Sequence, residues 1–144
     1  MSLKNRVSAQ KLLAAAQYYQ ANPAQFVRDK IGDEVFDYQD EILDSINRNK
    51  VTAVRSTHNS GKSFIASRAV GTWLTNRINS IVVTTAPTFR QVENVIWREI
   101  RGMHTSSKTP LGRKPLTTRW DISENWYAIG ISPRDPTSMQ GFHA

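Results

Sequence analysis

The segment from Val51 to Ser63, Val-Thr-Ala-Val-Arg-Ser-Thr-His-Asn-Ser-Gly-Lys-Ser, restricts the possible folds of this chain more than any other segment. Its first four residues are apolar or β-branched and predict a short buried strand, and an amphipathic helical pattern follows Ser63. A strand, a loop that ends in Gly-Lys-Ser and a helix are the context of a phosphate-binding loop. Backbone N–H groups, the helix dipole and the charge of Lys62 would together attract phosphate.

This loop departs from the usual phosphate-binding signature at its first position. Ser56 stands where the signature has a glycine five residues before Gly61. We expect phosphate to contact the loop formed by Ser56, Thr57, His58, Asn59, Ser60, Gly61, Lys62 and Ser63. We expect Ser63 to face a magnesium ion, and His58 could donate to a phosphate oxygen. The alternative is a strand-turn-helix in which Lys62 is merely solvated.

Composition narrows the class of protein. With 144 residues, the chain is long enough for one domain or for part of one. A hydrophobic fraction of 39% and a charged fraction of 22% are typical of folded globular proteins. No apolar run approaches the roughly 20 residues of a membrane span, and no signal-peptide core is present. Because cysteine is also absent, we expect a cytoplasmic protein.

The charge of the chain favours a polyanionic partner. The net charge is +7 and the pI is near 10.1, so nucleic acid is the first candidate and an anionic membrane surface the second. Binding to a membrane surface would need a helix with an apolar face opposite a basic face, and the sequence contains no such helix. We therefore expect no membrane partner. The residues that could contact DNA are Arg90, Arg98, Arg101, Lys108, Arg113 and Lys114. The alternative is a solvated face on which Glu93 and Glu99 are local charge partners.

The remaining pattern predicts an α/β fold. Residues 1–7 are expected to be a polar leader or residues added for expression, and helices are expected over residues 8–20 with Ser8 as N-cap, 23–31 closed by Gly32, and 37–50 with Asp37 as N-cap. Ile81 to Thr85 predicts a strand that is covered on both faces and pairs in parallel. Thr88 is expected to cap a long helix that buries Phe89, Val92, Ile96, Ile100 and Met103. Residues 105–118 predict a loop that is either mobile or functional, and residues 119–122 and 126–131 predict an antiparallel hairpin.

The third expected helix opens with Phe36-Asp37-Tyr38-Gln39. A glutamine amide can pair with N6 and N7 of adenine, and an adjacent aromatic ring can pack on the base. The spacing alone favours a simpler interpretation, in which Phe36 and Tyr38 are core residues and Gln39 is a solvated helix residue.

Hydrolysis of a nucleoside triphosphate needs chemistry beyond the loop. A second strand must end in a carboxylate that holds the magnesium shell, usually followed by a glutamate that activates water. No apolar run of this chain ends in Asp-Glu, and Asp121 is only a weak substitute because aspartate is common in turns. The three histidines are scattered and match no catalytic pattern.

Four motifs, taken in order, resemble one known family. They are Phe-Asp-Tyr-Gln, Arg-Ser-Thr-His-Asn-Ser-Gly-Lys-Ser, Thr-Ala-Pro-Thr-Phe-Arg-Gln-Val-Glu-Asn and Gln-Gly-Phe-His-Ala. From Pro23 to Ala144 the chain is similar to the N-terminal ATPase domain of phage terminase large subunits, the motors that package viral genomes. Loops without the first glycine are familiar in that family, so Ser56 fits it.

The resemblance implies a fold and a site. The fold would be a P-loop NTPase of the RecA/ASCE type, incomplete here, with a mostly parallel sheet flanked by helices, N-terminal helices and a C-terminal antiparallel hairpin. Residues 8–144 would be the front part of the ATPase domain, without the carboxylate strand and without the nuclease domain. Gln39 would recognise adenine, and Gly61, Lys62 and Ser63 would hold the phosphates and magnesium. Family members often carry a loop arginine that acts on the γ-phosphate, and that role would fall to Arg55 or His58.

By the same resemblance, ATP and Mg²⁺ are the expected cofactors and double-stranded DNA the expected substrate. The small terminase subunit, the portal protein and a ring of copies on the portal are the expected partners. Two alternatives stay open. A superfamily 2 helicase would share the early motifs, and a non-catalytic nucleic-acid-binding module would keep only a vestigial nucleotide site.

Overall fold

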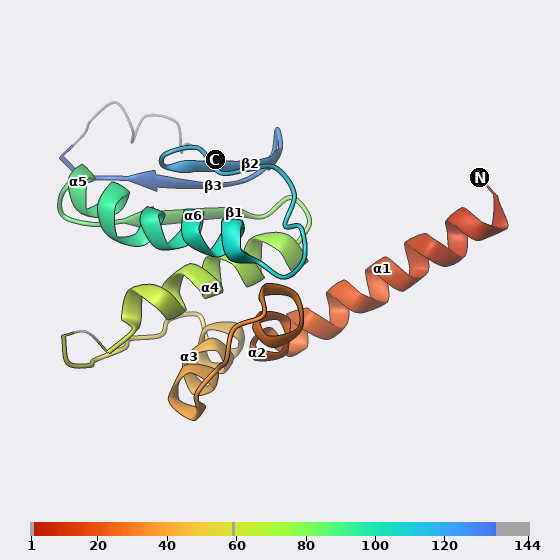
Figure 1. The fold of residues 1–144 in the computed structure, drawn as a ribbon, viewed down its shortest axis with the longest axis horizontal. Coiled ribbons are helices and arrows are strands. Elements are labelled where there is room, and N and C mark those ends of the chain that lie inside the picture. The colour runs from red at the N-terminus through yellow and green to blue at the C-terminus, as the bar shows by residue number, and fades with distance from the viewer. Residues whose placement is uncertain (1, 59, 135–144) are drawn as a thin grey trace.

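The computed structural model describes residues 2–58 and 60–134 (Figure 1). Most of the described chain is helical, and three short strands lie toward its C-terminal part. The elements in chain order are α1 (Leu3–Ala21), α2 (Pro23–Phe26), the π-helical η1 (Val27–Ile31), α3 (Asp37–Arg48), α4 (Lys62–Asn76), β1 (Ile81–Thr85), α5 (Phe89–Gln91), the π-helical η2 (Val92–Ile96), α6 (Trp97–Ser106), β2 (Arg119–Ser123) and β3 (Trp126–Ile131).

The three strands form one mixed sheet in the order β1-β3-β2. β1 runs parallel to β3, with Ile81 opposite Tyr127, and β2 pairs antiparallel with β3. The helix α4 and the continuous helical segment from α5 to α6 lie on one side of the sheet, and α2 and α3 lie beyond α4 (Figure 1). The α/β class and the antiparallel hairpin are confirmed. The sheet is mixed rather than mostly parallel.

The predicted strand from Val51 to Val54 is wrong. These residues follow α3 as an extended segment without strand pairing, and the side chain of Val51 is 84% exposed. A hollow of about 650 Å³ lies between Lys50 at the end of α3 and the strand β1. Backbone groups need a partner strand or water. The strand β1 pairs with β3 and not with this segment, in which Val51 and Val54 are exposed.

The strand β1 is covered on one face only within the described part of the chain, although its apolar sequence predicts cover on both. Thr84 faces the helices, because its Oγ1 accepts a hydrogen bond from Trp97 Nε1 at 2.8 Å. Ile81 and Val83 point to the opposite side and are exposed. Their neighbours on β3 in the parallel register are Tyr127 and Ile129.

The helical segment after β1 buries most of the predicted face, because Ile96 also packs partly buried against the core, and it departs from the prediction at Phe89 and Trp97. Val92, Ile100 and Met103 are buried as predicted, whereas Phe89 is 40% exposed and Trp97 is fully buried. The π-helical turn η2 is the reason, because its wider spacing rotates the residues after it relative to those before it. Trp97 is thereby turned onto the sheet, where Gly130 makes room for it: a Cβ on Gly130 would overlap both Trp97 and Val92.

The helix ends follow ordinary capping chemistry with two shifts from the predicted residues. α1 begins at Leu3 and is capped by Ser2, whose Oγ accepts a hydrogen bond from Asn5 N–H at 3.3 Å, so Ser8 lies inside the helix. α3 has Phe36 rather than Asp37 at its N-cap. Gly32 ends η1 in the left-handed conformation with φ 91°, and Thr88 caps α5, both as predicted.

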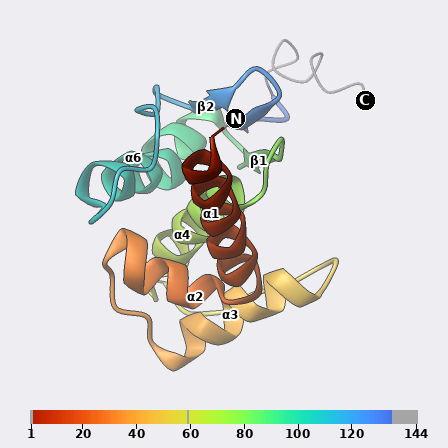
Figure 2. The same ribbon diagram turned by 90° about the vertical axis from the view of Figure 1, so that its right-hand side faces the viewer.

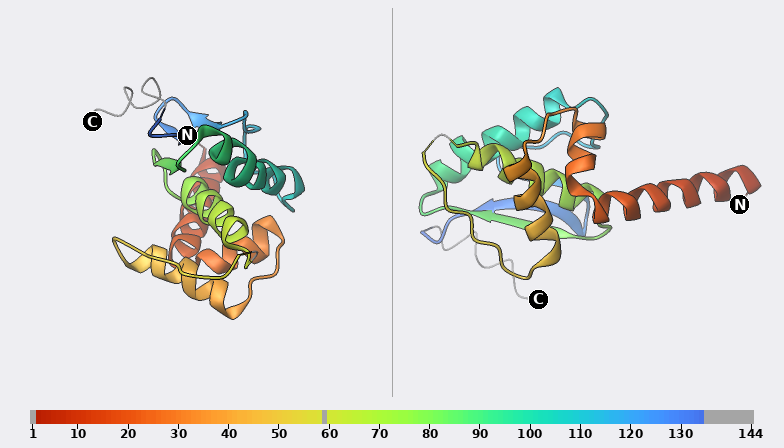
Figure 3. Two further views of the ribbon diagram at one scale, coloured as in Figure 1. Left: turned by 90° about the vertical axis from the view of Figure 1, so that its left-hand side faces the viewer. Right: turned by 90° about the horizontal axis from the view of Figure 1, so that it is seen from below.

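The helix α1 leaves the rest of the fold as a long arm (Figures 1 and 3). In Figure 2 this arm points toward the viewer, in front of α4. None of its residues is buried. Over the stretches that the structure describes, no helix combines the length and the apolar character that crossing a bilayer would require.

Candidate phosphate-binding site

The Gly-Lys-Ser sequence forms the first turn of α4, as the loop motif predicts. Gly61 is the N-cap residue and has a left-handed backbone with φ 79° and ψ 20°, which glycine adopts without strain. The first helical bond runs from Ile65 N–H to Gly61 C=O at 3.0 Å. The N–H groups of the first turn have no helical acceptor, and the N-cap makes no side-chain hydrogen bond to them. The N-terminus of this 15-residue helix is therefore a ready site for an anion.

The loop before α4 curls back over its own lysine. Lys62 Nζ donates a hydrogen bond to Ser56 C=O at 3.1 Å, and the hydroxyls of Ser56 and Ser60 lie 2.5 Å apart. Lys62 remains exposed, so its ammonium group can exchange the carbonyl for a stronger, charged acceptor. Ser56 thus fills the position of the missing glycine and closes the loop through both its backbone and its side chain.

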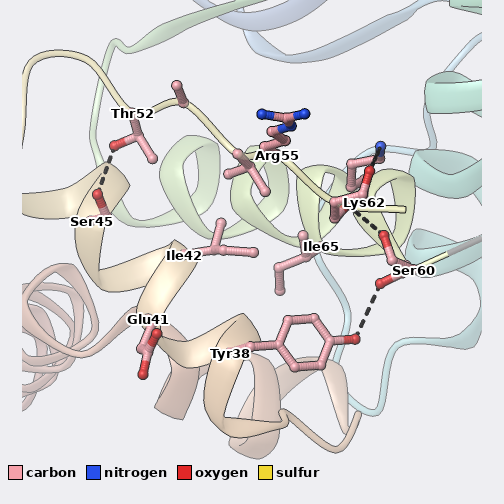
Figure 4. A pocket seen from close by; sticks show the side chains of 13 residues that line it. Tyr38, Glu41, Ile42, Ser45, Thr52, Arg55, Ser60, Lys62 and Ile65 are labelled. Atoms are coloured by element: carbon pink, nitrogen blue, oxygen red, sulfur yellow. Dashed lines mark hydrogen bonds between the residues drawn. The ribbon is translucent and has the colours of Figure 1, made fainter. Parts of the chain in front are cut away.

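A pocket of about 350 Å³ lies beside the loop, between α3 and α4 (Figure 4). Ile42 of α3 and Ile65 of α4 point toward each other across it, and Arg55 and Lys62 supply its positive charge (Figure 4). A second hollow of about 630 Å³ lies on the side of Gly32, with Phe36, Gln39, Gly61 and Phe64 among its lining residues. Gly61 lines both spaces, so an anion at the N-terminus of α4 would lie between them; Glu41 also lines the first, and Asp33 and Glu34 also line the second.

Gln39 is held in place rather than solvated. It is buried; its Oε1 accepts a hydrogen bond from Phe36 N–H at 3.1 Å, and its Nε2 lies 3.4 Å from Tyr38 Oη. Phe36 and Tyr38 are 59% and 49% exposed, with nearly parallel rings whose centroids lie 6.3 Å apart. The interpretation of these three residues as a core pair beside a solvated glutamine is wrong. Because an amide oxygen accepts two hydrogen bonds, Gln39 can still accept one from a ligand in the second hollow.

Tyr38 ties the opening of α3 to the loop. Its hydroxyl donates a hydrogen bond to Ser60 C=O at 3.2 Å, and this bond connects the aromatic pair to the residue just before Gly61 (Figure 4). A Cβ on Gly61 would lie at ordinary contact distance from Gln39 and Tyr38. The phosphate-loop residues and the Phe-Asp-Tyr-Gln residues, far apart in the sequence, thus meet at one place.

The two residues proposed to act on a γ-phosphate occupy different places. Arg55 lines the first pocket together with Lys62, whereas His58 lies exposed in the turn of the loop, as does Thr57. Asn59 lies outside the described residues. The structure therefore brings Arg55, and not His58, to the pocket wall.

The residue that the loop motif assigns to a magnesium ion is Ser63. Ser63 is half-buried in the first turn of α4, and in residues 2–58 and 60–134 no three His, Asp or Glu side chains form a metal-binding group. Asp121 is engaged elsewhere, because both of its oxygens accept hydrogen bonds from Arg119 Nε at 2.9 and 3.0 Å. Magnesium prefers six oxygen ligands and keeps several waters. Ser63 fits as one of these ligands, with phosphate oxygens and water as the others.

Arg68 is a buried residue near the site that the sequence analysis missed. Its Nε donates to Asp33 at 2.8 Å, its Nη1 lies 3.5 Å from Glu99, and its guanidinium stacks 3.7 Å from the centroid of Phe64. Glu99 thus pairs with Arg68 rather than with the basic face of its own helix. The signal was a single arginine among the apolar positions of α4, between Ile65 and Val70.

The candidate DNA-binding residues divide between the last long helix and the loop that follows it. Arg90 and Arg98 are exposed, and Arg101 donates a hydrogen bond to Thr117 C=O, so it connects α6 to this loop. The backbone N–H of Lys108 donates to Ile31 C=O at 2.9 Å. Arg113 and Lys114 are exposed beyond that anchor. The loop is therefore fastened to the fold near its start and near its end, although its sequence shows no apolar periodicity.

The candidate site combines the N-terminus of α4 with a lysine, a hydroxyl and two neighbouring pockets. The residues come from α3, the loop and α4. Comparisons with protein families, with curated proteins and with solved structures find no match for this chain.

Proposed function

We propose that this chain binds ATP and Mg²⁺ through residues 56–63, and that it is the ATP-binding part of a motor that packages double-stranded viral DNA. The observation that carries the proposal is the placement of Gly61, Lys62 and Ser63 at the open N-terminus of α4. The resemblance of the four ordered motifs to phage terminase large subunits supports the second half of the proposal, and with it a P-loop NTPase fold.

In this proposal, the chain holds the phosphates with its backbone. The N–H groups of Lys62, Ser63 and Phe64 point along the axis of α4 toward the ligand. Lys62 leaves Ser56 C=O and moves its charge onto the β- and γ-phosphates, and Ser63 turns its hydroxyl to the ion. The nucleotide supplies the phosphoanhydride whose cleavage drives such a motor.

The adenine ring belongs in the hollow lined by Phe36, Gln39 and Phe64. Phe36 offers an exposed ring face, and the amide of Gln39 offers an acceptor and a donor next to Gly61. The hydrogen bond from Tyr38 Oη to Ser60 C=O holds the residues that line this hollow next to the loop.

In this proposal, the residues of this chain that bind ATP are not sufficient to hydrolyse it. Arg55, at the pocket wall, is placed better than His58 to neutralise charge on a γ-phosphate. Hydrolysis also needs a carboxylate at the ion, and within residues 2–58 and 60–134 no three His, Asp or Glu side chains form a metal-binding group. We therefore propose that the 144 residues bind ATP and hydrolyse it poorly on their own.

A non-catalytic nucleic-acid-binding module is the second candidate, and the net charge of +7 favours it. It would bind DNA through exposed cations such as Arg98 and Arg113, in a salt-dependent way that ignores ATP. A superfamily 2 helicase fragment would share the nucleotide site proposed above, so a binding measurement does not separate it from a packaging motor.

Competition between nucleotides tests the proposed site. A fluorescent ATP analogue bound with Mg²⁺ is displaced by unlabelled ATP, ADP and AMP in separate titrations. We expect ATP and ADP to compete effectively and AMP to be at least about tenfold weaker, because the loop grips the β-phosphate that AMP lacks. Equal competition by AMP, or no binding of the analogue, would contradict the proposal. ATP-independent DNA binding in that case would favour the second candidate.

A further inference from the structure

A second concave surface lies at the base of α1, on the other side of α4 from α3. It has a volume of about 430 Å³ and is lined by Leu12, Tyr19, Phe26, Leu111, Ile122 and Trp126, among others. Its two walls are α1 and the end of the β2-β3 hairpin with the loop before it. We call this surface the α1 groove. It shares no lining residue with the two spaces around Gly61.

The walls of the α1 groove are fixed by hydrogen bonds. Gln20 Nε2 donates to Asn76 C=O at 2.6 Å, and Tyr19 Oη donates to Asp29 at 3.1 Å, so the base of α1 is fastened to its neighbours. Burial, and after it the hydrogen bond to Asp29, raises the pKa of the Tyr19 phenol, which stays neutral. On the other wall, Trp126 Nε1 donates to Leu74 C=O at 2.6 Å. The groove is therefore a preformed apolar surface.

The apolar surface continues from the groove onto α1. Leu12 lines the groove and is nevertheless 72% exposed, and Leu13 beside it is exposed as well. The arm contacts the rest of the described chain only toward its base (Figures 1 and 3). A short isolated helix is only marginally stable in water, so an arm of this kind gains most from a partner that covers its apolar residues.

The charges around the α1 groove are predominantly positive. α1 contains Lys4, Arg6 and Lys11 and no acidic residue. Lys30 lines the groove, and the sequence Arg113-Lys114 follows its wall directly. Of the nearby carboxylates, Asp29 and Asp121 already accept hydrogen bonds from other residues of the chain, and Glu124 lies exposed in the turn before Trp126. A ligand of this surface meets an apolar floor and a cationic rim.

We propose that the α1 groove binds an acidic amphipathic helix of a partner protein. The apolar side of that helix packs on Leu12, Ile122 and Trp126, and its carboxylates pair with Lys30 in the lining and with Lys11, which precedes Leu12 on α1. A second copy of this chain is a poor occupant, because its own α1 would bring the same positive charges to the contact. This inference does not depend on the nucleotide site.

A synthetic peptide tests the groove directly. We would measure fluorescence anisotropy of a labelled helical peptide with leucines at i, i+3, i+4 and i+7 and glutamates elsewhere, and of the same peptide with lysines in place of the glutamates. The glutamate peptide should bind at least tenfold more tightly than the lysine peptide, and the difference should shrink as salt is added. Leu12→Glu should weaken binding of the glutamate peptide at least tenfold, because it puts a carboxylate on the apolar floor.

Leu3→Glu is the matched control, since it makes the same change on the same helix about 14 Å farther along, at 1.5 Å per residue. It should leave the affinity within about twofold. Equal binding of the two peptides, or equal loss in the Leu12 and Leu3 variants, would overturn the proposal. Self-association of the chain through Leu12, seen by sedimentation, would identify a second copy as the occupant instead. Displacement of the peptide by short duplex DNA would assign the rim to nucleic acid.

Discussion

Replacing Lys62 with alanine is expected to lower the affinity for ATP about 10-fold to 100-fold. Lys62 contributes a charge-assisted hydrogen bond to the phosphates, and bonds of this kind contribute about 1.5–3 kcal/mol. The substitution costs the fold little, because Lys62 is exposed and its one bond within the chain goes to Ser56 C=O. Equilibrium titration with the fluorescent ATP analogue measures the affinity, and circular dichroism monitors the helices.

Lys50→Ala is the matched control for this prediction. Lys50 is also an exposed lysine, and it lies two residues after the end of α3, outside residues 56–63. Its removal should change the affinity for ATP by less than about twofold, because a surface charge outside the site is largely screened. If both variants lose the same affinity, then ATP is held by the general positive charge of the chain and not by the loop.

Replacing Trp97 with alanine is expected to destabilise the fold by about 3–5 kcal/mol, the usual cost of truncating a buried tryptophan. Trp97 is completely buried, packs against Gly130 and donates a hydrogen bond to Thr84 Oγ1 on β1. Its loss leaves a cavity between the sheet and α6 and removes the donor to Thr84 Oγ1, whose own hydrogen bond goes to Ile129 C=O at 3.5 Å. Urea unfolding followed by circular dichroism gives the free energy of unfolding, and a marginal domain could be largely unfolded by the change.

Trp73→Ala is the control, because it makes the same substitution at another position in the fold. Trp73 is half-buried on α4, and its main partner is the guanidinium of Arg77, 3.6 Å from the ring centroid. A cation–π contact at a partly exposed site contributes about 0.5–1 kcal/mol, and less surface is uncovered than at Trp97. A loss at Trp73 as large as that at Trp97 would contradict the assignment of Trp97 as the core contact between sheet and helix.

Local pattern was sufficient to predict much of the fold. Ile81 to Thr85 is a strand because its β-branched residues leave few alternatives, and the hairpin from Arg119 to Ile131 follows from two such runs around a turn. Gly32 and Thr88 marked their helix ends through conformational freedom and capping chemistry. Each of these signals depends on only a few neighbouring residues, so it can be recognised from the sequence alone.

The wrong predictions concern segments whose structure depends on contacts with residues far away in the sequence. Val51 to Val54 has the composition of a strand, but a strand needs a neighbour, and the three described strands pair only with one another. Phe89 fits the helical period of its segment and is still exposed, because the π-helical turn at residues 92–96 brings Trp97 inward. The residues of that turn carry no sequence signal that predicts a π-helix.

The sequence predicted the position of the Gly-Lys-Ser loop before a helix, but it did not predict the burial of the residues around that loop. Gly61 and Lys62 were recognisable from the Gly-Lys-Ser motif, and the structure places them at the start of α4. The burial of Gln39 depends on its bond to Phe36 N–H, and that of Arg68 on Asp33 and Glu99, which come from separate elements. Contacts between elements are set by the assembled fold and leave little trace in local sequence.

The most direct test of phosphate binding at the N-terminus of α4 is the backbone amide spectrum of the protein during titration with ATP and Mg²⁺. Anion contacts deshield the N–H groups that point at them, so the amide resonances of Gly61, Lys62 and Ser63 should shift most, with smaller shifts at Gln39 and Phe64. Unchanged resonances at Gly61 to Ser63, or largest shifts at Arg98 and Arg101, would place the nucleotide elsewhere and contradict the proposed function.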